Sequence, residues 1–500
     1  MSNIVDEKGK QKMIRSLGKF WEFGGGRMVI AVICAHSVSI SIGICQSYSA
    51  ILLPQLKVSE KYRNLTEDET SWIASLGTIT NPVGSILSGV LAEYFGRRRS
   101  IQISSLPFVL GWICLGLAQN INWLYAGRLI TGVAAGMSTA CYTYVGEIST
   151  PESRGFMQAL GPICTSFGIV LTYTLGYYMD WAKVAYISIA FGIFSVIAIE
   201  FIPESPAYLL KQNRVTEGFD VLLWFRRNNA LAQQEVDRFH ENEKLNRSKT
   251  ISFREMYFGP QNVKPFLILV GLFFLQEFSG IYTLLFYAVN FFKESSVDIN
   301  EYVASIIVGA IRFSMSVILA YLINKSGRKI LCTMSSIGMA VTMLIVAIYV
   351  KYYEVNSDQT KILSYLPLIG IMLNVAFSMI GMLPVPWVMV GEMFSIQVRP
   401  IMMGVVICIA QIFIFICVKI YNNMNTALHF SGTLMVFVAA SIISAIYCKF
   451  VLIETHNKTL EDIEAYFRNE RREMTGMDNR GFDDRSESSD KVIAEVKVES

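Results

Sequence analysis

The sequence has few charged residues: 17% of its 500 residues are Asp, Glu, Lys or Arg, while 53% are hydrophobic. Soluble domains average about 25% charged residues, so this composition excludes an ordinary water-soluble globular protein. The formal net charge of +3 is too small to indicate a nucleic-acid partner. We therefore expect a membrane protein whose surroundings are a lipid bilayer.

Patterns typical of catalysis and metal binding are also missing. The four histidines are scattered, and no phosphate-binding loop, Ser-His-Asp arrangement or zinc spacing is present. All nine cysteines lie in or at the ends of apolar stretches, which predicts neither a disulfide framework nor a metal cluster. We expect no enzyme, no cofactor and no metal, and the sequence carries no signal for an oligomeric state.

Apolar runs long enough to cross a bilayer occur along most of the chain. A spanning helix needs about 20 mostly apolar residues. Twelve runs meet this need, at 28–52, 71–93, 101–119, 124–146, 158–179, 184–202, 265–292, 302–324, 330–350, 363–392, 401–423 and 430–453. Most connecting loops are short, so consecutive helices are predicted to be antiparallel in an all-α membrane protein.

Basic residues set the predicted orientation. Loops rich in Lys and Arg, such as 97–99 and 325–329, alternate with loops that are poorer in both. The positive-inside rule places the basic loops and both termini in the cytoplasm of a multi-pass plasma-membrane protein. The loop after the first span then faces outside, where Asn64-Leu65-Thr66 predicts a glycan on Asn64.

A charged segment divides the twelve spans into six and six. The polar, basic residues at the start do not have the short apolar run of a cleaved signal peptide. The predicted parts are a cytoplasmic tail (1–27), a six-helix half (28–202), a cytoplasmic linker with short helices (203–264), a second six-helix half (265–453), and a cytoplasmic tail that is largely disordered at its end (454–500).

The two halves repeat a set of charged positions in the same order. The matched pairs are Gly96-Arg97-Arg98 with Gly327-Arg328-Lys329, Gly146-Glu147 and Arg154 with Gly391-Glu392 and Arg399, and Glu204 with Glu454. Three matches in one order predict parallel six-helix repeats. Such repeats are typical of a carrier that alternates access to a site near the membrane midplane.

Several motifs carry a family resemblance. They are AEYFGRRR (92–99), AGRLITGVAAG (126–136), YVGEISTPESRG (144–155), PESPAYLL (203–210), QEFSGI (276–281), SGRK (326–329), PVPW with GEMF (384–394) and ETHNKTLEDI (454–463). Over essentially residues 28–467 the chain resembles the sugar-porter branch of the major facilitator superfamily. The nearest resemblance is to insect facilitated trehalose transporters, and a more distant one is to mammalian facilitative glucose transporters. It implies the major facilitator fold and a sugar substrate, trehalose or a hexose.

The repeated charges form a predicted cytoplasmic gate. Its members are Glu93, Arg97, Arg98, Glu147, Arg154, Glu204, Arg328, Glu392, Arg399 and Glu454. One interpretation is that they are topology signals and exposed ion pairs, each worth less than about 1 kcal/mol. The other, favoured by the repeat and the resemblance, is a latch that forms in the outward-open state and breaks in the inward-open state.

The predicted substrate site lies in the seventh, eighth and tenth spans, with one position in the fifth. Polar residues at helical spacing around Gln276 and Thr283 predict either a packing stripe or a cavity wall. By resemblance, Gln276 and Trp387 match sugar-contacting positions, and Pro384 and Pro386 predict a broken tenth span. At other contact positions this chain departs from the family's amides, with Glu277, Tyr282, Arg312 and, in a looser alignment, Ser166.

An acid and a base thus occupy two positions of one implied pocket. Arg312 shares a small, polar helix face with Ser305, Gly309 and Ser316, so we expect it to point inward. A charge at the centre of a span costs about 2.5–3.5 kcal/mol on insertion scales and usually has a partner. We hypothesise a Glu277–Arg312 ion pair. The alternative is that Arg312 reaches toward the interface and Glu277 is protonated.

The first span bears on the transport mechanism. Proton symporters of this family typically carry an Asp there, whereas HSVSISIGICQSY (36–48) has no acid. This favours facilitative uniport. A proton-coupled symporter that uses Glu277 and a non-transporting sugar sensor are the alternatives.

Overall fold

The computed structural model describes residues 25–467, apart from gaps at 63, 151–152, 248–257, 295–299, 324, 357–362, 364, 395–397, 456–457, 459–462 and 464–465. The predicted terminal tails, 1–27 and 454–500, lie for the most part outside these residues. Every regular element among the described residues is a helix.

The first half of the chain crosses the bundle six times. Its helices are α2 (Gly25–Val58), the pair α3 (Glu67–Ile79) and α4 (Asn81–Phe95), α5 (Arg97–Gly116), the pair α6 (Ile121–Met137) and α7 (Ala140–Ile148), α8 (Arg154–Tyr178), and α9 (Trp181–Glu200). The second span is divided at Thr80, directly before an α4 that has Pro82 in its first turn. Proline lacks an N–H donor, so it suits the first turn of a helix and weakens the helix interior.

The second half also crosses six times. Its helices are α14 (Pro260–Phe278) with α15 (Ile281–Phe286) and α16 (Ala288–Glu294), then α17 (Glu301–Leu322), α18 (Arg328–Val355), the pair α19 (Leu366–Ile380) and α20 (Val385–Glu392), and α21 (Arg399–Phe450). The helix α21 contains two spans, which meet at His429, where φ is 59°. The predicted twelve-helix fold is confirmed.

Among the described residues, seven helical stretches are long and apolar enough to cross a membrane by themselves. The remaining crossings are divided by breaks, or begin with charged residues as α5 does at Arg97. Large apolar side chains are exposed around the bundle, among them Ile86, Leu110 and Ile446. Such an apolar outer surface suits contact with lipid rather than water.

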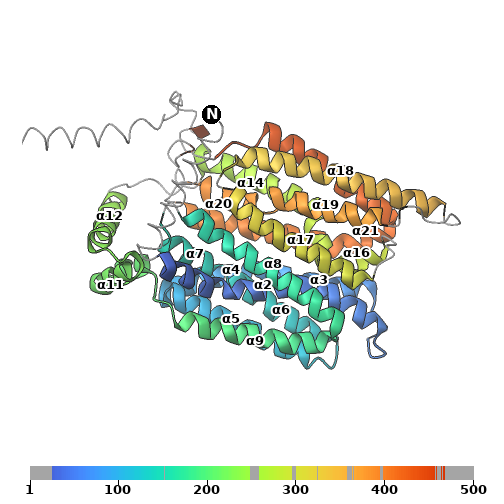
Figure 1. Cartoon of the computed structure of the whole chain (residues 1–500), viewed down its shortest axis with the longest axis horizontal. Coiled ribbons are helices and arrows are strands. Elements are labelled where there is room, and N and C mark those ends of the chain that lie inside the picture. The colour runs from blue at the N-terminus through green and yellow to red at the C-terminus, as the bar shows by residue number, and fades with distance from the viewer. Residues whose placement is uncertain are drawn as a thin grey trace, which may run out of the picture.

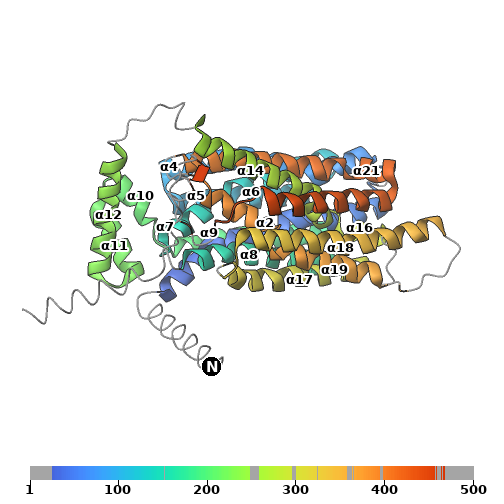
Figure 2. The same ribbon diagram turned by 90° about the horizontal axis from the view of Figure 1, so that it is seen from above.

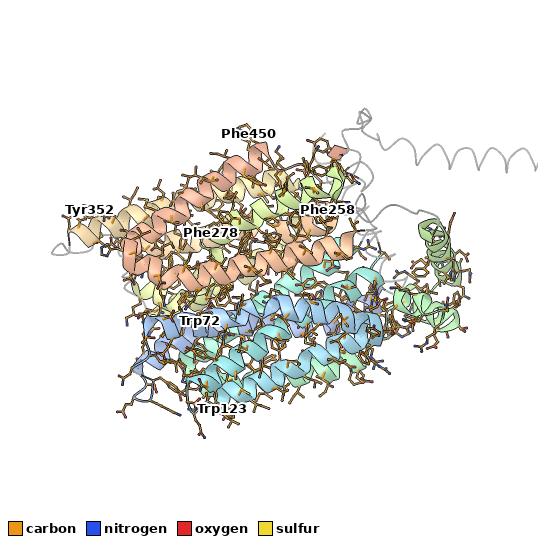
Figure 3. All side chains as sticks on the ribbon, turned by 180° about the vertical axis from the view of Figure 1, so that it is seen from behind. Trp72, Trp123, Phe258, Phe278, Tyr352 and Phe450 are labelled. Atoms are coloured by element: carbon orange, nitrogen blue, oxygen red, sulfur yellow. The ribbon has the colours of Figure 1, made fainter. Side chains whose placement is uncertain are left out.

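The two halves form two neighbouring bundles, α2–α9 and α14–α21 (Figure 1). They meet where α8 packs against α17 and where α3 packs against α21. Trp72 of α3 lies at this boundary (Figure 3), and its ring centroid is 5.9 Å from that of Phe415 of α21.

Three short helices join the halves at one end of the bundle: α10 (Pro206–Lys211), α11 (Val215–Arg226) and α12 (Asn229–Arg247). Figure 2 shows them grouped beyond the ends of the long helices. We name this the linker end, and the opposite end, which carries the loop 59–66, the distal end.

The linker helices are attached to the first half. Arg226, at the end of α11, is buried, pairs with Glu235 of α12 at 2.7 Å, and donates to the carbonyl oxygen of Ile148 at 3.0 Å. Arg27 of α2 donates to the carbonyl oxygen of Trp224 at 3.4 Å and lies 5.3 Å from the centroid of its ring. Among the described residues, no hydrogen bond or ion pair joins these helices to the second half.

Side-chain caps start several spans at the distal end. Thr66 and Glu69 form a capping box: the Thr66 N–H donates to the Glu69 carboxylate at 2.8 Å, and the Glu69 N–H donates to the Thr66 hydroxyl at 3.2 Å. Asn120 caps α6 and Asn300 caps α17 in the same region. Such caps satisfy backbone N–H groups that have no partner within the helix.

Candidate functional site

A charged network holds the linker end of the first half together. Arg97 Nη2 lies 3.0 Å from Glu147 Oε1, which joins the start of α5 to the end of α7. The backbone N–H groups of Arg97 and Arg98 donate to Glu204 Oε1 at 2.8 and 3.0 Å. The Ser205 hydroxyl donates to the other oxygen of Glu147.

The second half contains an equivalent network. Arg328 Nη2 lies 2.9 Å from Glu392 Oε1, and the Arg328 N–H donates to Glu454 Oε1 at 2.9 Å. The Thr455 hydroxyl donates to Glu392 Oε2 at 2.6 Å, as Ser205 does to Glu147.

Glycine makes room for the acids of both networks. A Cβ at Gly96 would lie 2.4 Å from Glu204 Oε2, and one at Gly327 would lie 2.3 Å from Glu454 Oε2. Gly96 also has φ of 91°, a conformation that other residues rarely adopt. The repeated Gly-Arg motifs therefore bring a backbone turn against a carboxylate.

These networks contain two Arg–Glu pairs of the predicted inter-helix latch. Both Arg–Glu pairs join helices of a single half, so they are not locks between the halves. Of the remaining predicted gate residues, Glu93 pairs with Lys211, and Arg98 Nη2 lies 2.5 Å from Glu200 Oε1. Arg154 is exposed, and no ion pair among the described residues reaches it. The side chain of Arg399 lies outside the described residues.

A contact that the sequence analysis missed joins the halves at the distal end. Lys419 of α21 donates to Asp68 Oδ1 at 2.5 Å and to the Ser71 hydroxyl at 2.7 Å, and its ammonium lies 4.2 Å from the centroid of Trp72. Asn422 adds a hydrogen bond to Glu67 at 3.3 Å. Lys419 is the one charged residue in the run 401–423, a signal that could have marked it.

Other bonds between the halves lie at the middle and toward the distal end. The Tyr173 hydroxyl of α8 donates to the Leu285 carbonyl at 2.9 Å, and Asn81 Nδ2 donates to Gln411 Oε1 at 3.1 Å. At the linker end, the described part of the chain shows no hydrogen bond or ion pair between the halves. The halves are therefore closed on each other at the distal end, and in this state both Arg–Glu pairs are intact.

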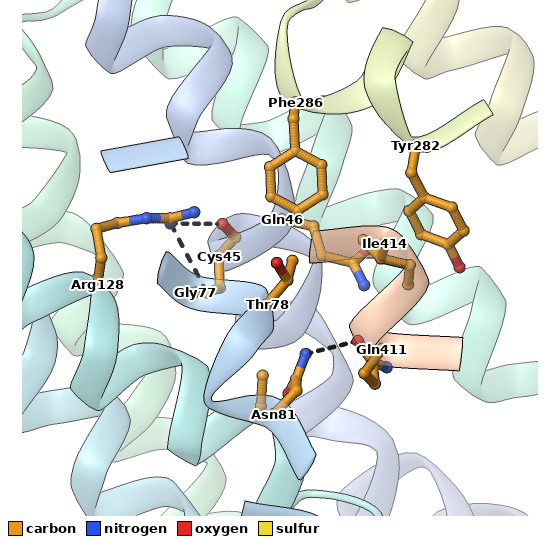
Figure 4. Close-up of a pocket in the computed structure, with 11 residues that line it drawn as sticks. Cys45, Gln46, Gly77, Thr78, Asn81, Arg128, Tyr282, Phe286, Gln411 and Ile414 are labelled. Carbon is orange, nitrogen blue, oxygen red and sulfur yellow. Dashed lines mark hydrogen bonds between the residues drawn. The ribbon is translucent and has the colours of Figure 1, made fainter. Parts of the chain in front are cut away.

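A pocket lies between the halves near the middle of the bundle (Figure 4). Both halves line it, with Cys45, Gln46, Gly77, Thr78, Asn81, Arg128 and Ala135 from the first and Tyr282, Phe286, Gln411 and Ile414 from the second. Tyr282 alone belongs to the predicted substrate set. Gln46 and Gln411 are amides within apolar runs, so the criterion that selected Gln276 could have found them.

Arg128 is fully buried beside this pocket without a carboxylate partner among the described residues. Its guanidinium donates to the carbonyl oxygens of Cys45 at 2.9 Å, Ile73 at 3.1 Å and Ala74 at 3.2 Å. It thereby fixes α6 to α2 and α3 through backbone atoms, as a guanidinium with five donors can do.

Two broken helices of the second half meet at Gln276. The seventh span breaks after α14 because Gly280 has φ of 85°, and a Cβ there would lie 2.6 Å from the Phe437 ring. The tenth span breaks between α19 and α20, where Leu383 accepts a hydrogen bond from Gln276 Nε2 at 2.8 Å. Gln276 thus supplies a donor to backbone at the break.

Several polar atoms around these breaks have no partner. Gln276 Oε1, Thr283 Oγ1 and Gln46 Oε1 are sealed from solvent without a hydrogen bond. The Trp387 ring lies 5.0 Å from Phe273, centroid to centroid, and its side chain reaches the Tyr282 hydroxyl. Ser166 is buried on α8. Amide oxygens beside aromatic rings are the groups that a polyhydroxylated ring can use.

The hypothesised Glu277–Arg312 ion pair is not formed, and the hypothesis is wrong for this conformation. Glu277 is fully buried, and neither of its carboxyl oxygens has a hydrogen-bond partner. Glu277 lies near Cys417 of α21, whereas Arg312 lies near Tyr173 and Tyr282. No hydrogen bond or ion pair among the described residues reaches the Arg312 guanidinium.

Twelve crossings in two repeated halves, with a polar pocket between them, define a multi-pass membrane carrier. Residues 31–467 match the family model described as "Sugar (and other) transporter". The chain belongs to this family of sugar transporters, which confirms the resemblance to sugar porters.

Relatives and solved structures agree with this assignment. The chain is 30% identical over 441 residues to the facilitated trehalose transporter Tret1 of Bombyx mori, covering 87% of this chain and 86% of that protein. It is 30% identical over 439 residues to sugar transporter ERD6-like 6 of Arabidopsis thaliana, covering 86% and 88%. The proton:xylose symporter XylE bound to 6-bromo-6-deoxy-D-glucose shares the fold, with a TM-score of 0.74 at 21% identity over 89% of this chain and 100% of that one. The inward-open XylE of E. coli gives a TM-score of 0.72 at 19% identity over 87% and 98%.

Proposed function

We propose that the protein is a facilitative transporter that moves a sugar, trehalose or a hexose, across the plasma membrane by alternating access. The observation that carries this is the set of polar groups between and beside the halves, where Gln46, Gln411 and Tyr282 line a small pocket and the amide oxygen of Gln276 is buried without a partner. Its amides suit sugar hydroxyls and its aromatic rings suit the apolar faces of the sugar ring.

The transport cycle follows from where the halves touch. Contacts through Lys419 and Asp68 close the distal end, so the solute would leave toward the linker end in this state. The return requires these contacts to separate while the linker ends approach. In that state we expect Arg154 and Arg399, two members of the proposed gate, to contact the opposite half. In the present state Arg154 is exposed and has no ion pair among the described residues.

The proposed orientation puts the linker end and both termini in the cytoplasm. Asn64 is exposed in the distal loop, on the outer side in this orientation. We expect glycosidase treatment of protein from cells to increase its electrophoretic mobility, and Asn64→Gln to remove that change. A glycan that persists in Asn64→Gln would place the modification elsewhere.

Uniport is supported by the surroundings of Arg128, which bonds to carbonyl oxygens and has no acid from α2 beside it. The second candidate is a proton symporter, which the buried and unpartnered Glu277 favours. In liposomes of clamped pH, an imposed pH step should not concentrate sugar above equilibrium. Accumulation that Glu277→Gln abolishes would establish symport.

A sugar sensor that binds without transporting is the remaining alternative. Counterflow separates it from a carrier, because labelled sugar accumulates transiently in liposomes preloaded with unlabelled sugar only when the protein exchanges the two. We expect counterflow. Saturable sugar binding without counterflow would establish the sensor.

A further inference from the structure

Arg312 lies where the two halves pack together. It stands near the middle of α17, which spans Glu301–Leu322 and packs against α8 of the first half. One turn earlier, a Cβ at Gly309 would lie 3.2 Å from the Tyr173 ring. On the next residue, the Phe313 ring lies 6.3 Å from Phe167. The backbone around Arg312 is therefore fixed against the opposite half.

The Arg312 guanidinium has no acceptor among the described residues. Its Nε is sealed from solvent without a partner, while the side chain as a whole is half-buried. Neither terminal nitrogen has a hydrogen bond or ion pair to a described residue. The hydroxyls of Tyr173 and Tyr282 lie within electrostatic reach of the guanidinium, and the Tyr173 hydroxyl already donates to the Leu285 carbonyl.

Three other arginines in and beside the bundle are bonded. Arg97 and Arg328 have carboxylates, and Arg128 has three carbonyl oxygens. Glu277 does not fill this role for Arg312, because it is fully buried and lies toward Cys417. The Arg312 guanidinium is thus a donor without an acceptor among the described residues, on a helix that packs against the opposite half. Charged residues within spans usually pair or line a solute path.

The geometry of a guanidinium favours one kind of acceptor. Its planar fork matches the two oxygens of a carboxylate, and its single positive charge balances a single negative one. A phosphate would bring up to two negative charges to one cation. A monoanionic carboxylate is therefore the better match.

We propose that Arg312 binds a carboxylate on the solute, so that the carrier prefers a sugar acid such as a hexuronate to the neutral sugar. This rests on the proposed sugar transport and narrows its substrate class. Tyr282, near both Arg312 and Glu277, would then face the sugar ring beside the bound carboxylate.

The test is uptake by the full-length protein in liposomes, with labelled D-glucuronate, D-glucose and trehalose. We expect the ratio of turnover to half-saturation concentration to be at least tenfold higher for glucuronate than for glucose. Unlabelled glucuronate should also inhibit uptake of labelled glucose by the unaltered protein. If the protein takes up glucose or trehalose and glucuronate neither enters nor competes, this inference is wrong and the proposed function stands. If no sugar enters, both fail.

Variants locate the effect. Arg312→Asn should lower the glucuronate preference at least tenfold while glucose uptake persists, and Arg312→Lys should retain part of the preference because it keeps the charge. Arg99→Asn, which removes an exposed guanidinium at the linker end, is the matched control and should leave the ratio unchanged. An unchanged preference in Arg312→Asn would overturn the proposal. A second result would also overturn it: Arg312→Asn abolishes glucose uptake, and adding Glu277→Gln restores it. That result would mean that Arg312 forms an ion pair with Glu277 in another conformation.

Discussion

Arg97 and Arg328 occupy equivalent places in the two halves and make the same contacts. Each guanidinium pairs with a glutamate, at 3.0 Å for Glu147 and 2.9 Å for Glu392, and each backbone N–H donates to a second acid. Because each of these partners belongs to the same half, the two networks hold each half rigid. The motion between the halves then falls to contacts elsewhere.

Glu392→Gln should lower turnover several-fold and lower thermal stability, with the half-saturation concentration changed by less than about twofold. The glutamate is partly buried, and loss of one partner of such a pair leaves Arg328 without its charge partner at a cost of about 1–3 kcal/mol. Glu241→Gln, on the exposed surface of α12, is the control. A large change in half-saturation with normal turnover would contradict a supporting role.

Lys419→Ala should loosen the distal end. The Lys419–Asp68 pair is partly exposed, with 18% and 71% of the two side chains accessible, so we expect about 0.2–1 kcal/mol, a shift of up to about fivefold in the balance of states. Spin labels placed at the distal ends of α3 and α21 would report longer distances in the variant. Adding Asp68→Ala to Lys419→Ala should lengthen these distances little further. If the effects of the two substitutions were fully additive, the two residues would act separately.

Gly280→Ala should destabilise the protein. The residue has φ of 85°, and the added Cβ would lie 2.6 Å from the Phe437 ring, so backbone strain of about 1–3 kcal/mol is combined with a clash. Gly89→Ala is the matched control, because nothing lies within 4 Å of the Cβ built there in α4. Thermal unfolding in detergent should separate the two variants, and equal melting temperatures would refute the strain.

Gln276→Leu should reduce both stability and sugar binding. It removes the donor to the buried Leu383 carbonyl, and an unpaired buried acceptor costs about 1–3 kcal/mol. It also removes the free Oε1 proposed for the sugar. Gln233→Leu on the exposed face of α12 controls for the loss of an amide. Normal binding affinity in Gln276→Leu would remove this residue from the site.

The breaks in the spans were predictable where local chemistry causes them. Pro384 and Pro386 predict the break between α19 and α20, and the structure has it. The break at Thr80 follows from Pro82 in the same way, although the apolar run 71–93 conceals it. Length and hydrophobicity are properties of a local segment, so the number of crossings could be predicted from sequence.

The direction of side chains near Glu277 could not be predicted. The polar stripe around Gln276 and Thr283 assumes one continuous helix, whereas the left-handed Gly280 ends α14 and starts α15 on a different path. Residues on the two sides of this turn no longer share one face. The same turn explains why Tyr282 lines the pocket while Glu277 lies toward α21.

The hydrogen bonds from Arg226 to Ile148 and from Arg27 to Trp224 make α11 and α12 useful sites for reporting the state of the carrier. Since these helices are bonded to one half, they would tilt with that half whenever the carrier changes state. A fluorophore on α12, paired with one at the end of α18, would therefore read the state of a single molecule. An antibody fragment that binds α12 would add mass for imaging without blocking the solute pathway.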